Sequence, residues 1–323
     1  MRVLVTGAFG NVGESALLEL LPRGMDVIAF DLPTKQNKEV YEGMEHKSNL
    51  DVVWGDIRDR ELVSRTISNG LDCIIHLAAI IPPQSEANPE LAYEVNIGGT
   101  RNLLDGVAFS TSKPKFVYAS SIATYGHCDG TGPPRSASDP QIATDNYTSH
   151  KIESERLVKE SGLPWTILRF GVVTPLTLDS DVGPIMFDIP LEQRIEFVHT
   201  RDIGLAVANA VTAASEGKIL LLGGGEDCRM HYRDFVEALL EAMGVGMLPE
   251  SAFKQPTCQE DYFHTDWMDS REAQEILQYQ TRSFEQFLED YRRLLGHGRY
   301  LVRLLRPLIR WRLLSQSPYH KKD

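Results

Sequence analysis

The 323-residue chain has little of several things that mark specialised classes of protein. Its four cysteines, Cys73, Cys128, Cys228 and Cys258, are widely spaced and form no Cys-x-x-Cys pair. This argues against a disulfide framework or a metal site and fits a reducing compartment. No stretch approaches the roughly 18 uncharged apolar residues of a membrane span. Residues 1–6 run straight into a strand pattern without the apolar region of a signal peptide, so we expect a cytoplasmic protein.

Positive charge is scarce except near the C-terminus. The whole chain carries a net charge of -12, so we do not expect it to bind nucleic acid. Between Tyr291 and Asp323, however, nine Lys or Arg residues accompany one Asp, which gives this segment +8 and leaves -20 for the remainder. Residues 291–323 are therefore expected to form a separable basic tail.

The first apolar run is followed by closely spaced glycines. Residues 3–5 are typical of a buried parallel strand, and a helical pattern covers 15–21. Between them, the spacing Gly-x-x-Gly-x-x-Gly lets the backbone turn tightly and approach a pyrophosphate at the helix N-terminus. The alternative is a plain glycine-rich turn, which the flanking strand and helix make less attractive. The expected cofactor contacts here are Gly7, Phe9, Gly10, Asn11, Val12 and Gly13.

An acidic residue closes the next apolar run, 27–30. Asp31 lies about 20 residues after the glycines, where a carboxylate can accept hydrogen bonds from both hydroxyls of the adenosine ribose. The same carboxylate would repel a 2′-phosphate. Leu32 and Pro33 follow it rather than an arginine. These features favour NAD over NADP as the cofactor.

A third strand, 52–54, is expected to end at the same edge of the sheet. After it, Asp56 would hydrogen-bond the adenine amine while Ile57 packs on the ring. The alternative is that Asp56 or Asp59 caps the following helix.

The fourth strand, 73–76, ends in small residues. Leu77, Ala78 and Ala79 would let the backbone pass close to the cofactor. His76 is expected to be a hydrogen-bonded structural histidine rather than a catalyst. A long helix over 89–107 follows and carries Asn96.

A tyrosine and a lysine four residues apart supply the expected catalytic chemistry. On a helix, Tyr147 and Lys151 lie one turn apart on the same face. Tyrosine has a pKa of about 10, and an ammonium group beside it favours the phenolate. A fifth strand, 115–119, would deliver Ser120 and Ser121 to the edge where open parallel sheets bind ligands. A serine hydroxyl there can bond a substrate oxygen and the tyrosine, with simple strand-end capping as the alternative, above all for Ser120.

Strands and helices alternate through this part of the chain, and further strands are expected at 164–169 and 218–222. This alternation predicts an α/β fold with a doubly wound parallel sheet.

Together these segments resemble the extended short-chain dehydrogenases/reductases, and more narrowly the NAD-dependent epimerase/dehydratase family. The resemblance covers about residues 1–290. Its motifs are Thr6-Gly7-x-x-Gly10-x-x-Gly13, Asp31, Gly55-Asp56, His76-Leu77-Ala78-Ala79, Asn96-x-x-Gly99-Thr100, Ser120-Ser121 with Tyr125-Gly126, Tyr147-x-x-x-Lys151-x-x-x-Glu155, the segment 197–202 and Asp269-Ser270-Arg271.

The resemblance implies roles for individual residues. Tyr147 would be the acid/base, Lys151 its electrostatic partner and a ligand of the nicotinamide ribose, and Ser121 a donor to the substrate oxygen. Asn96 would lie near the cofactor and substrate or support the site. The implied reaction is hydride transfer between a substrate carbon and NAD, with Tyr147 moving the hydroxyl proton. Dimerisation through the helices that hold Asn96 and Tyr147 is also implied.

The resemblance also implies a Rossmann-type domain with a small C-terminal substrate-binding lobe. We expect an NAD-binding domain at 1–170, to which 197–225 returns, a substrate-binding lobe from 171–196 and 226–290, and the basic tail at 291–323.

The sequence departs from the family pattern beside the active site. His150 stands where the family often has serine before the lysine, and residues 170–175 lack the usual Asn and Tyr-Gly-Pro turn. Only 29 residues separate Arg169 from His199, whereas sugar-nucleotide enzymes usually have a longer segment there. A smaller or more apolar substrate is therefore an alternative, and Arg169, Arg194 and Arg201 are candidates for meeting a carboxylate or phosphate.

Three functions follow from these observations. The first is an NAD-dependent oxidoreductase or epimerase, of epimerase/dehydratase type, acting on a sugar-like or small polar substrate. The second is a dehydrogenase of a small or apolar hydroxy substrate, of uronate or hydroxysteroid type. The third is a non-catalytic dinucleotide-sensing protein, whose relatives usually lose the tyrosine or lysine that is kept here.

The basic tail has an amphipathic pattern. Arg299, Arg303, Arg306 and Arg310 share one helical face, and Pro307 is expected to kink the helix. Such a segment can pack on the acidic body or on a second subunit, or it can lie on an anionic membrane surface; nucleic-acid contact is the remaining alternative.

Overall fold

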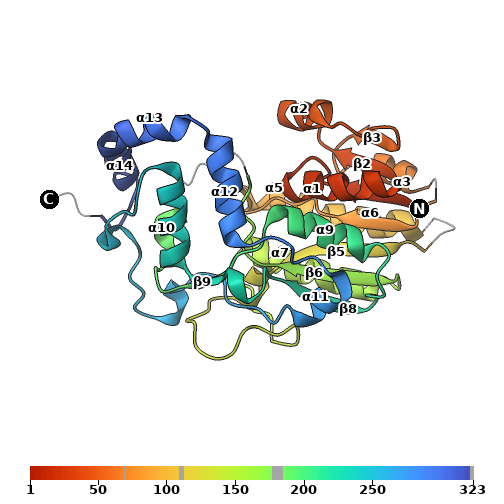
Figure 1. Ribbon diagram of the computed structural model, residues 1–323. Helices are drawn as coiled ribbons and strands as arrows, with labels where there is room; N and C mark the ends of the chain where they lie inside the picture. Colours follow the sequence, from red (N-terminus) through yellow and green to blue (C-terminus); the bar gives the residue numbers. More distant parts are fainter. Residues whose placement is uncertain (69, 109–112, 177–184, 321–323) are drawn as a thin grey trace.

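Seven parallel strands form the centre of the protein (Figure 1). The computed structural model describes residues 1–68, 70–108, 113–176 and 185–320. The strands lie in the order β3-β2-β1-β4-β5-β6-β8, which reverses between β1 and β4 and confirms the doubly wound Rossmann-type sheet. Their bounds are β1 Arg2–Thr6, β2 Asp26–Asp31, β3 Leu50–Trp54, β4 Cys73–His76, β5 Lys115–Ser121, β6 Trp165–Phe170 and β8 Lys218–Leu222.

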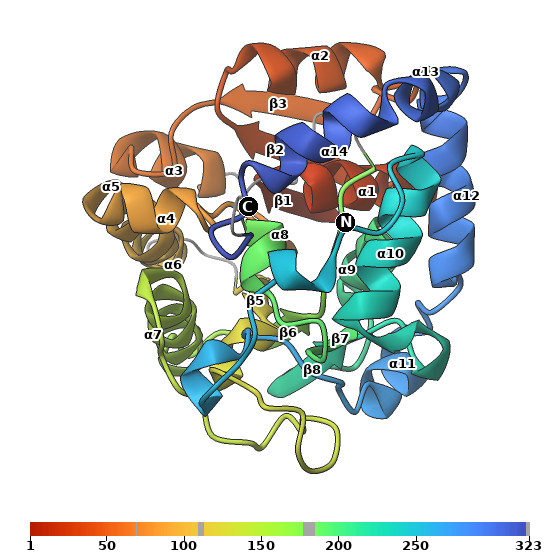
Figure 2. The ribbon, with the colours of Figure 1, turned by 90° about the vertical axis from the view of Figure 1, so that its left-hand side faces the viewer.

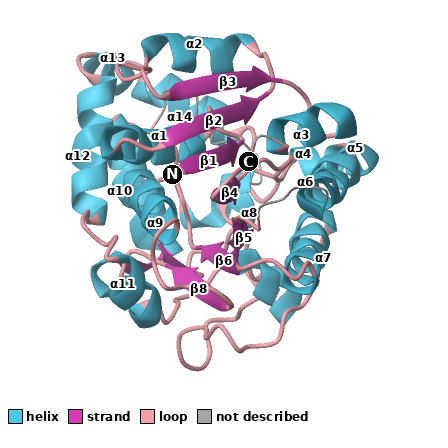
Figure 3. Ribbon diagram, turned by 90° about the vertical axis from the view of Figure 1, so that its right-hand side faces the viewer, coloured by secondary structure: helices cyan, strands magenta, loops and turns pink. Residues whose placement is uncertain are grey.

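Both faces of this sheet are covered by helices, as Figure 3 shows. Alternate side chains of a strand point to opposite faces, so Val3 and Val5 join one apolar cluster while Leu4 joins the other. Burial on both sides explains why the strands read as continuous apolar runs rather than as alternating ones. The first cluster includes α1 (Asn11–Leu20), α9 (Thr200–Ala210) and α11 (Arg271–Leu277), and the second includes α3 (Arg60–Ile67), α6 (Gly99–Ala108) and α7 (Asn146–Glu160).

A buried histidine joins β4 to its neighbours. One ring nitrogen of His76 is hydrogen-bonded to the Thr6 hydroxyl (2.8 Å) and the other to the Thr100 hydroxyl (2.9 Å). Burial lowers the pKa of His76 to about 3, so the ring is neutral at physiological pH. The structural role expected for His76 is confirmed.

The helix expected over 89–107 is interrupted. It consists of α5 (Pro89–Tyr93), a π-helical segment at Glu94–Gly98 that contains Asn96, and α6. Single π-helical turns are rare and often lie at functional sites. Hydrophobic periodicity does not distinguish such a turn from a regular helix.

A second, smaller body lies beside the sheet, on the left in Figure 1. It contains a two-stranded antiparallel sheet of β7 (Arg194–Glu196) and β9 (Arg229–His231). Its core is rich in phenylalanine, namely Phe187, Phe197, Phe235, Phe253 and Phe287. Its helices are α8 (Ile185–Asp188), α10 (Tyr232–Met243) and α12 (Phe284–Leu295).

The segment 226–290, expected in the lobe, divides between the two bodies. Ala273 and Leu277 of α11 are buried in the cluster under the main sheet, so this helix packs on the nucleotide-binding body. Residues 177–184 of the expected lobe and 321–323 of the tail lie outside the described residues.

The tail forms two short helices, α13 (Gly298–Leu304) and α14 (Arg306–Leu314), and the break expected at Pro307 falls at the start of α14. None of the helices in the described part of the chain is long and apolar enough to cross a bilayer. The remaining elements are α2 (Lys35–Gly43), α4 (Gln84–Ala87) and short 3-10 helices at Leu21–Arg23, Ile122–Tyr125, Glu226–Cys228, Glu250–Ala252 and Gln259–Asp261.

Helices α1 and α9 approach each other closely because Gly204 has no side chain. A Cβ atom at Gly204 would lie 2.5 Å from the carbonyl carbon of Ser15. At the N-terminal ends of the two helices, the Thr200 hydroxyl donates to the side-chain oxygen of Asn11 (3.0 Å). This contact fixes the first turn of α1 against the first turn of α9.

We expect Gly204→Ala to lower the free energy of unfolding by about 1–3 kcal/mol, because the added methyl group forces the two helices apart. Urea unfolding followed by circular dichroism measures this. The matched control is Gly43→Ala at the end of α2, where no described atom lies within 4 Å of the new Cβ. Equal stability of the two variants would contradict the packing argument.

Candidate active site

A cleft at the carboxyl edge of the sheet consists of two adjoining cavities. One, of about 350 Å³, lies towards Asp31, and the other, of about 370 Å³, lies towards Tyr147. Both are lined by Gly7, Gly10, Leu77 and Ala79, so they meet where the glycine turn faces the end of β4. Two halves joined at a glycine turn match the shape of a dinucleotide, with one nucleoside on each side of a central pyrophosphate.

The glycine turn leaves room for a phosphate at the start of α1. Gly7 has φ of +66°, and a Cβ there would lie 2.8 Å from the Ala78 nitrogen. Among the described residues, no side chain caps α1, which begins at Asn11 with Gly10 as its N-cap. The first N–H groups of the helix are therefore available to an anion, which the helix dipole also favours. These residues fit NAD.

Asp31 is held in place at the adenosine end. One carboxylate oxygen accepts from the Phe9 N–H (2.8 Å), and the other accepts from the Leu32 N–H (2.8 Å) and the Asn37 side chain (3.0 Å). Burial raises the pKa of Asp31, and these hydrogen bonds oppose the rise. The oxygens keep lone pairs for the ribose hydroxyls. Asn37 also lines this cavity, and no motif in the sequence marks it.

Asp56 and Ile57 line the same cavity, together with Arg58. The Arg58 guanidinium pairs with Asp56 (2.7 Å) and holds the pKa of that carboxyl below its usual value. Helix capping belongs to Asp59, which accepts from the Leu62 N–H (3.0 Å) at the start of α3. Asp56 therefore faces the cleft, and Asp59 performs the structural role that was the alternative for both.

Most residues predicted for the cofactor line the cleft, and two do not. The lining residues are Gly7, Gly10, Asn11, Val12, Gly13, Asp31, Asp56, Ile57, Leu77, Ala78, Ala79 and Lys151. Phe9 is instead buried against Tyr41 and Trp54, and only its N–H reaches Asp31. Asn96 uses its amide group to hold the backbone of Ile80, accepting at 2.7 Å and donating at 2.9 Å, so it supports the site from behind.

The expected catalytic residues come together in the second half of the cleft. Ser121, at the end of β5, lies near Tyr147, in the first turn of α7, and lowers the pKa of its phenol. Lys151 lies one turn further on, with Nζ 5.7 Å from the centre of the Tyr147 ring and 2.7 Å from the Ala119 carbonyl oxygen, to which it donates. All three residues line the cavity.

Burial governs the charges of this pair. It raises the pKa of Tyr147 to about 12, against the opposing effect of the nearby Ser121 hydroxyl, and lowers the pKa of Lys151 to about 8. The sequence predicts instead that the lysine lowers the tyrosine pKa. In the structure, burial has the larger effect on Tyr147, and it also shifts the pKa of Lys151 towards neutrality.

Two carboxylates fix the start of the catalytic helix. Asp145 caps α7 by accepting from the Thr148 N–H (2.7 Å). Glu86, from α4, accepts from the backbone N–H groups of Asn146 and Tyr147 (both 3.2 Å). The sequence gives a signal for Asp145, which precedes a helical pattern, but none for Glu86, which lies 61 residues from Tyr147.

Arg169 differs from the substrate contact expected of it, whereas Ser120 lines the cavity but uses its hydroxyl within the protein. Arg169 is buried and donates to both carboxylate oxygens of Glu155 (2.9 and 2.7 Å) and to the Tyr125 hydroxyl (2.6 Å). Ser120 donates to the same carboxylate (2.6 Å). These side chains are used within the protein, because a buried charge needs its partners.

Arg201 also lies away from the cleft. It stands in the first turn of α9, where its side chain is 52% exposed and 3.9 Å from the Asp290 carboxylate. It lines neither half of the cleft.

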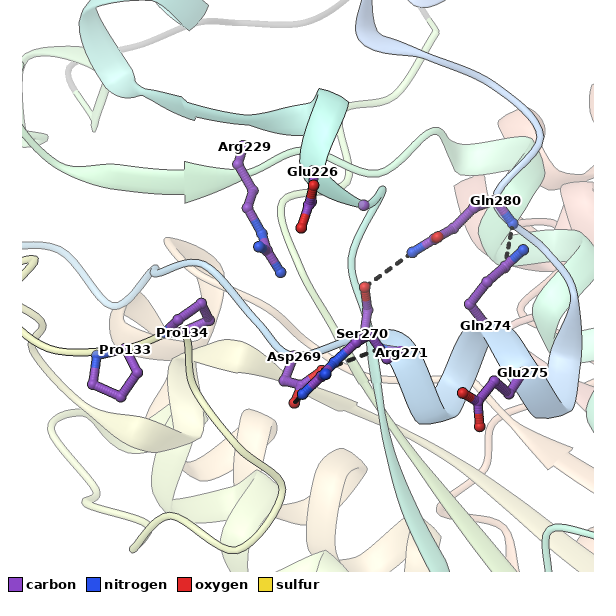
Figure 4. Close-up of a pocket in the computed structure, with 11 residues that line it drawn as sticks. Pro133, Pro134, Glu226, Arg229, Asp269, Ser270, Arg271, Gln274, Glu275 and Gln280 are labelled. Atoms are coloured by element: carbon purple, nitrogen blue, oxygen red, sulfur yellow. Dashed lines mark hydrogen bonds and ion pairs between the residues drawn. The ribbon is translucent and has the colours of Figure 1, made fainter.

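A separate cavity of about 570 Å³ lies between α11 and the lobe (Figure 4). It shares none of its described lining residues with the cleft. Its polar groups bond to one another, as Asp269 does with Arg271 (2.7 Å) and Ser270 with Gln280 (3.0 Å). Although larger than either half of the cleft, it lacks an acid/base pair of the Tyr147–Lys151 kind.

The fold and the cleft define a nucleotide-binding enzyme of the short-chain dehydrogenase type. The sequence matches the NAD dependent epimerase/dehydratase family over residues 3–246, and the chain belongs to that family. This is a family of NAD-dependent enzymes, which agrees with the Asp31 end of the cleft.

Individual relatives extend the comparison. The chain is 33% identical to the uncharacterized protein y4nG of Sinorhizobium fredii over 229 residues, which is 67% of this chain and 53% of that protein. It is 34% identical to CDP-paratose 2-epimerase of Salmonella typhi over 129 residues, 39% of this chain and 38% of the epimerase. The chain thus spans about half the length or less of these two relatives.

The fold is similar to that of a solved complex of UDP-glucuronic acid 4-epimerase from Bacillus cereus with UDP-glucuronic acid and NAD. The TM-score is 0.76 at 21% identity, covering 92% of this chain and all of that chain. At this identity the likeness concerns the fold.

We expect Lys151→Met to make the protein without added NAD more stable at pH 7, by about 1–3 kcal/mol. The folded-state pKa of about 8 lies below the ordinary value of 10.5, so the unfolded chain holds this proton more tightly. The cost of burying Lys151 is complete below pH 8 and disappears as the pH rises through 10.5.

The gain from Lys151→Met should therefore shrink between pH 7 and pH 10. Urea unfolding of both proteins at these two pH values measures it. Lys35→Met, which removes a 91% exposed ammonium group, is the control for the loss of a lysine that is not buried. A gain that stays constant with pH would contradict the burial of a titrating lysine.

Proposed function

We propose that the protein is an NAD-dependent enzyme of epimerase/dehydratase type that acts on a hydroxyl or carbonyl carbon of a sugar-like or small polar substrate. The observation that carries this proposal is the meeting of Tyr147, Ser121 and Lys151 in a cavity continuous with the dinucleotide cleft. Membership of the NAD dependent epimerase/dehydratase family supports it.

The residues divide the work as follows. Gly7, Gly10 and the first turn of α1 bind the pyrophosphate, and Asp31 binds the adenosine ribose. When bound, NAD supplies a nicotinamide ring that accepts or returns a hydride. Lys151 orients the nicotinamide ribose.

The proton of the substrate hydroxyl moves to Tyr147. Ser121 donates to the substrate oxygen and holds it beside the phenol, because Ser121 and Tyr147 line the same cavity. Positive charge from protonated Lys151 favours the phenolate form, and burial opposes it. In the reverse direction the phenol returns the proton to the substrate oxygen.

A dehydrogenase of a small or apolar hydroxy substrate is the second candidate. Ile81, Phe170 and Val173 line the cavity around Tyr147 and supply apolar surface there. The short segment between Arg169 and His199 also favours a substrate without a nucleotide.

We further propose that the protein works in the cytoplasm as a homodimer. Tyr93 of α5 exposes 48% of its surface, and its ring packs against His150 of α7. A second copy would cover it across α5 and α7. A monomer in sedimentation velocity at micromolar concentration would contradict this.

The test of the acid/base is Tyr147→Phe. We expect turnover to fall by roughly 10²–10⁴-fold while NAD binding is kept, because the substitution removes only the hydroxyl that transfers the proton. UDP-sugars, uronates and hydroxysteroids would be screened with the unmodified enzyme first. Tyr41→Phe is the matched control, since Tyr41 packs on Phe9 outside the cleft. Unchanged turnover of Tyr147→Phe would remove the proposed acid/base.

Retention of NAD separates the two candidate reactions. An epimerase or dehydratase recycles its cofactor, so we expect native mass spectrometry of the purified protein to show bound NAD. A protein that is purified empty and binds added NAD reversibly would instead support the dehydrogenase.

A further inference from the structure

The two tail helices carry a row of large apolar side chains on their outer side. Tyr300, Leu301 and Leu304 of α13, Leu305 at the break, and Leu308 and Trp311 of α14 are between 43% and 76% exposed. We call these six residues the outer strip. Exposed apolar side chains that occur singly need no explanation, but a continuous group of this kind marks an interaction surface.

The inner side of the same helices is already in use. Val302, Ile309, Leu313 and Leu314 pack against the phenylalanine-rich core of the lobe. Figure 1 shows α13 and α14 beside α10, at the end of the molecule away from β3. The outer strip is therefore the face that remains after the tail has packed on its own chain.

Two arginines lock this orientation. Arg306 donates to the Val245 carbonyl oxygen (2.8 Å), and Arg310 donates to the carbonyl oxygens of Gly246 (2.9 Å) and Met247 (2.6 Å). These carbonyls follow the C-terminal end of α10, where the helix dipole favours positive charge. This docking on the lobe is one of the alternatives that the sequence left open.

The end of the tail is anchored as well. The Ser317 hydroxyl donates to the Ala252 carbonyl oxygen (2.5 Å), and the Tyr319 hydroxyl donates to the Asp188 carboxylate (2.8 Å). The helices that carry the outer strip are thus fixed to the lobe by contacts within α14 and by contacts of the residues that follow it. It is a surface of fixed shape.

Charge decides what this surface fits. Residues 298–314 contain five arginines and no acidic residue. With Arg306 and Arg310 turned to the lobe, the side chains of Arg303 and Arg312 are exposed beside the strip. Segment 291–323 carries +8, while the rest of the chain carries -20. An acidic body with an apolar strip inside a basic rim is complementary to an anionic lipid surface and turns the rest of the protein away from it.

We propose that the outer strip is a docking surface for an anionic lipid bilayer. Leu304, Leu308 and Trp311 enter the boundary between headgroups and acyl chains, and Arg303 and Arg312 bond to lipid phosphates. The protein lies on the bilayer without crossing it. This proposal is independent of the catalytic reaction.

A second copy of the chain fits this surface less well. Pairing two outer strips about a twofold axis would bring two segments of +8 together, and like charges oppose such a contact. The dimer face proposed above also lies elsewhere, since Figure 2 shows α5 and α7 on the opposite side from α12 and α13. Both contacts can therefore form in one molecule.

Vesicle flotation tests the proposal with the full-length protein. One set of vesicles contains phosphatidylcholine alone, and the other contains phosphatidylcholine and phosphatidylglycerol in equal parts. We expect binding to the anionic vesicles to be at least about tenfold stronger and to weaken in high salt, because arginines near the surface contribute electrostatic attraction. Equal binding to both vesicles, or binding to neither, would overturn the proposal.

The variant Leu304→Glu/Leu308→Glu should abolish vesicle binding without changing the unfolding midpoint, because both side chains are exposed. The matched control is Leu18→Glu/Ile142→Glu, which also replaces two exposed apolar side chains but outside the tail. It should bind vesicles like the unmodified protein. Equal loss of binding in the two double variants would contradict a specific role of the strip.

Trp311 gives a second readout. Its fluorescence should shift to shorter wavelength with anionic vesicles, and Trp311→Phe should lose that shift while Trp267→Phe keeps it. Sedimentation velocity then distinguishes the other occupant. If Leu304→Glu/Leu308→Glu converts a dimer to a monomer, the strip is a subunit interface and the lipid proposal fails.

Discussion

The buried ion pair between Glu155 and Arg169 is the contact on which the catalytic geometry depends. It joins the middle of α7 to the end of β6, and Ser120 ties the same carboxylate to β5. Burial alone would raise the pKa of Glu155, but Arg169 holds it below its usual value, so both groups stay charged. Losing one partner would leave an uncompensated charge inside the protein. With α7 fixed in this way, Tyr147 at its start faces Ser121 at the end of β5.

The same ion pair shows why the role of Arg169 could not be predicted from the sequence. An arginine at the carboxyl end of a parallel strand lies at the ligand edge, and this made Arg169 a candidate for substrate. The position alone does not say which way the side chain points. Arg169 points towards α7 because its guanidinium group pairs with Glu155 on that helix. This pairing between a helix residue and a residue of the following strand is a tertiary contact, which no local sequence pattern encodes.

Features that depend on local pattern were predictable. The apolar runs gave all seven strands of the main sheet, and the glycine spacing, Asp31 and the Tyr147–Lys151 pair located the cleft. The three-residue strands β7 and β9 are too short for periodicity to indicate them. Glu86 and Asn37 act on the site only because the fold brings them there. For the tail, the amphipathic pattern was predictable, but only the carbonyl groups after α10 show that Arg306 and Arg310 face inward.

The polypeptide passes repeatedly between the main sheet and the lobe. It leaves the sheet after β6, returns with α9 and β8, leaves again at β9, and comes back with α11 before α12. The two bodies are thus connected by several segments of the polypeptide rather than by one linker. Cutting the chain at a single connection would leave them joined, and neither body can be inherited by recombination as one uninterrupted piece. The main sheet with its cofactor cleft and the phenylalanine-rich lobe therefore have to diverge together within one gene.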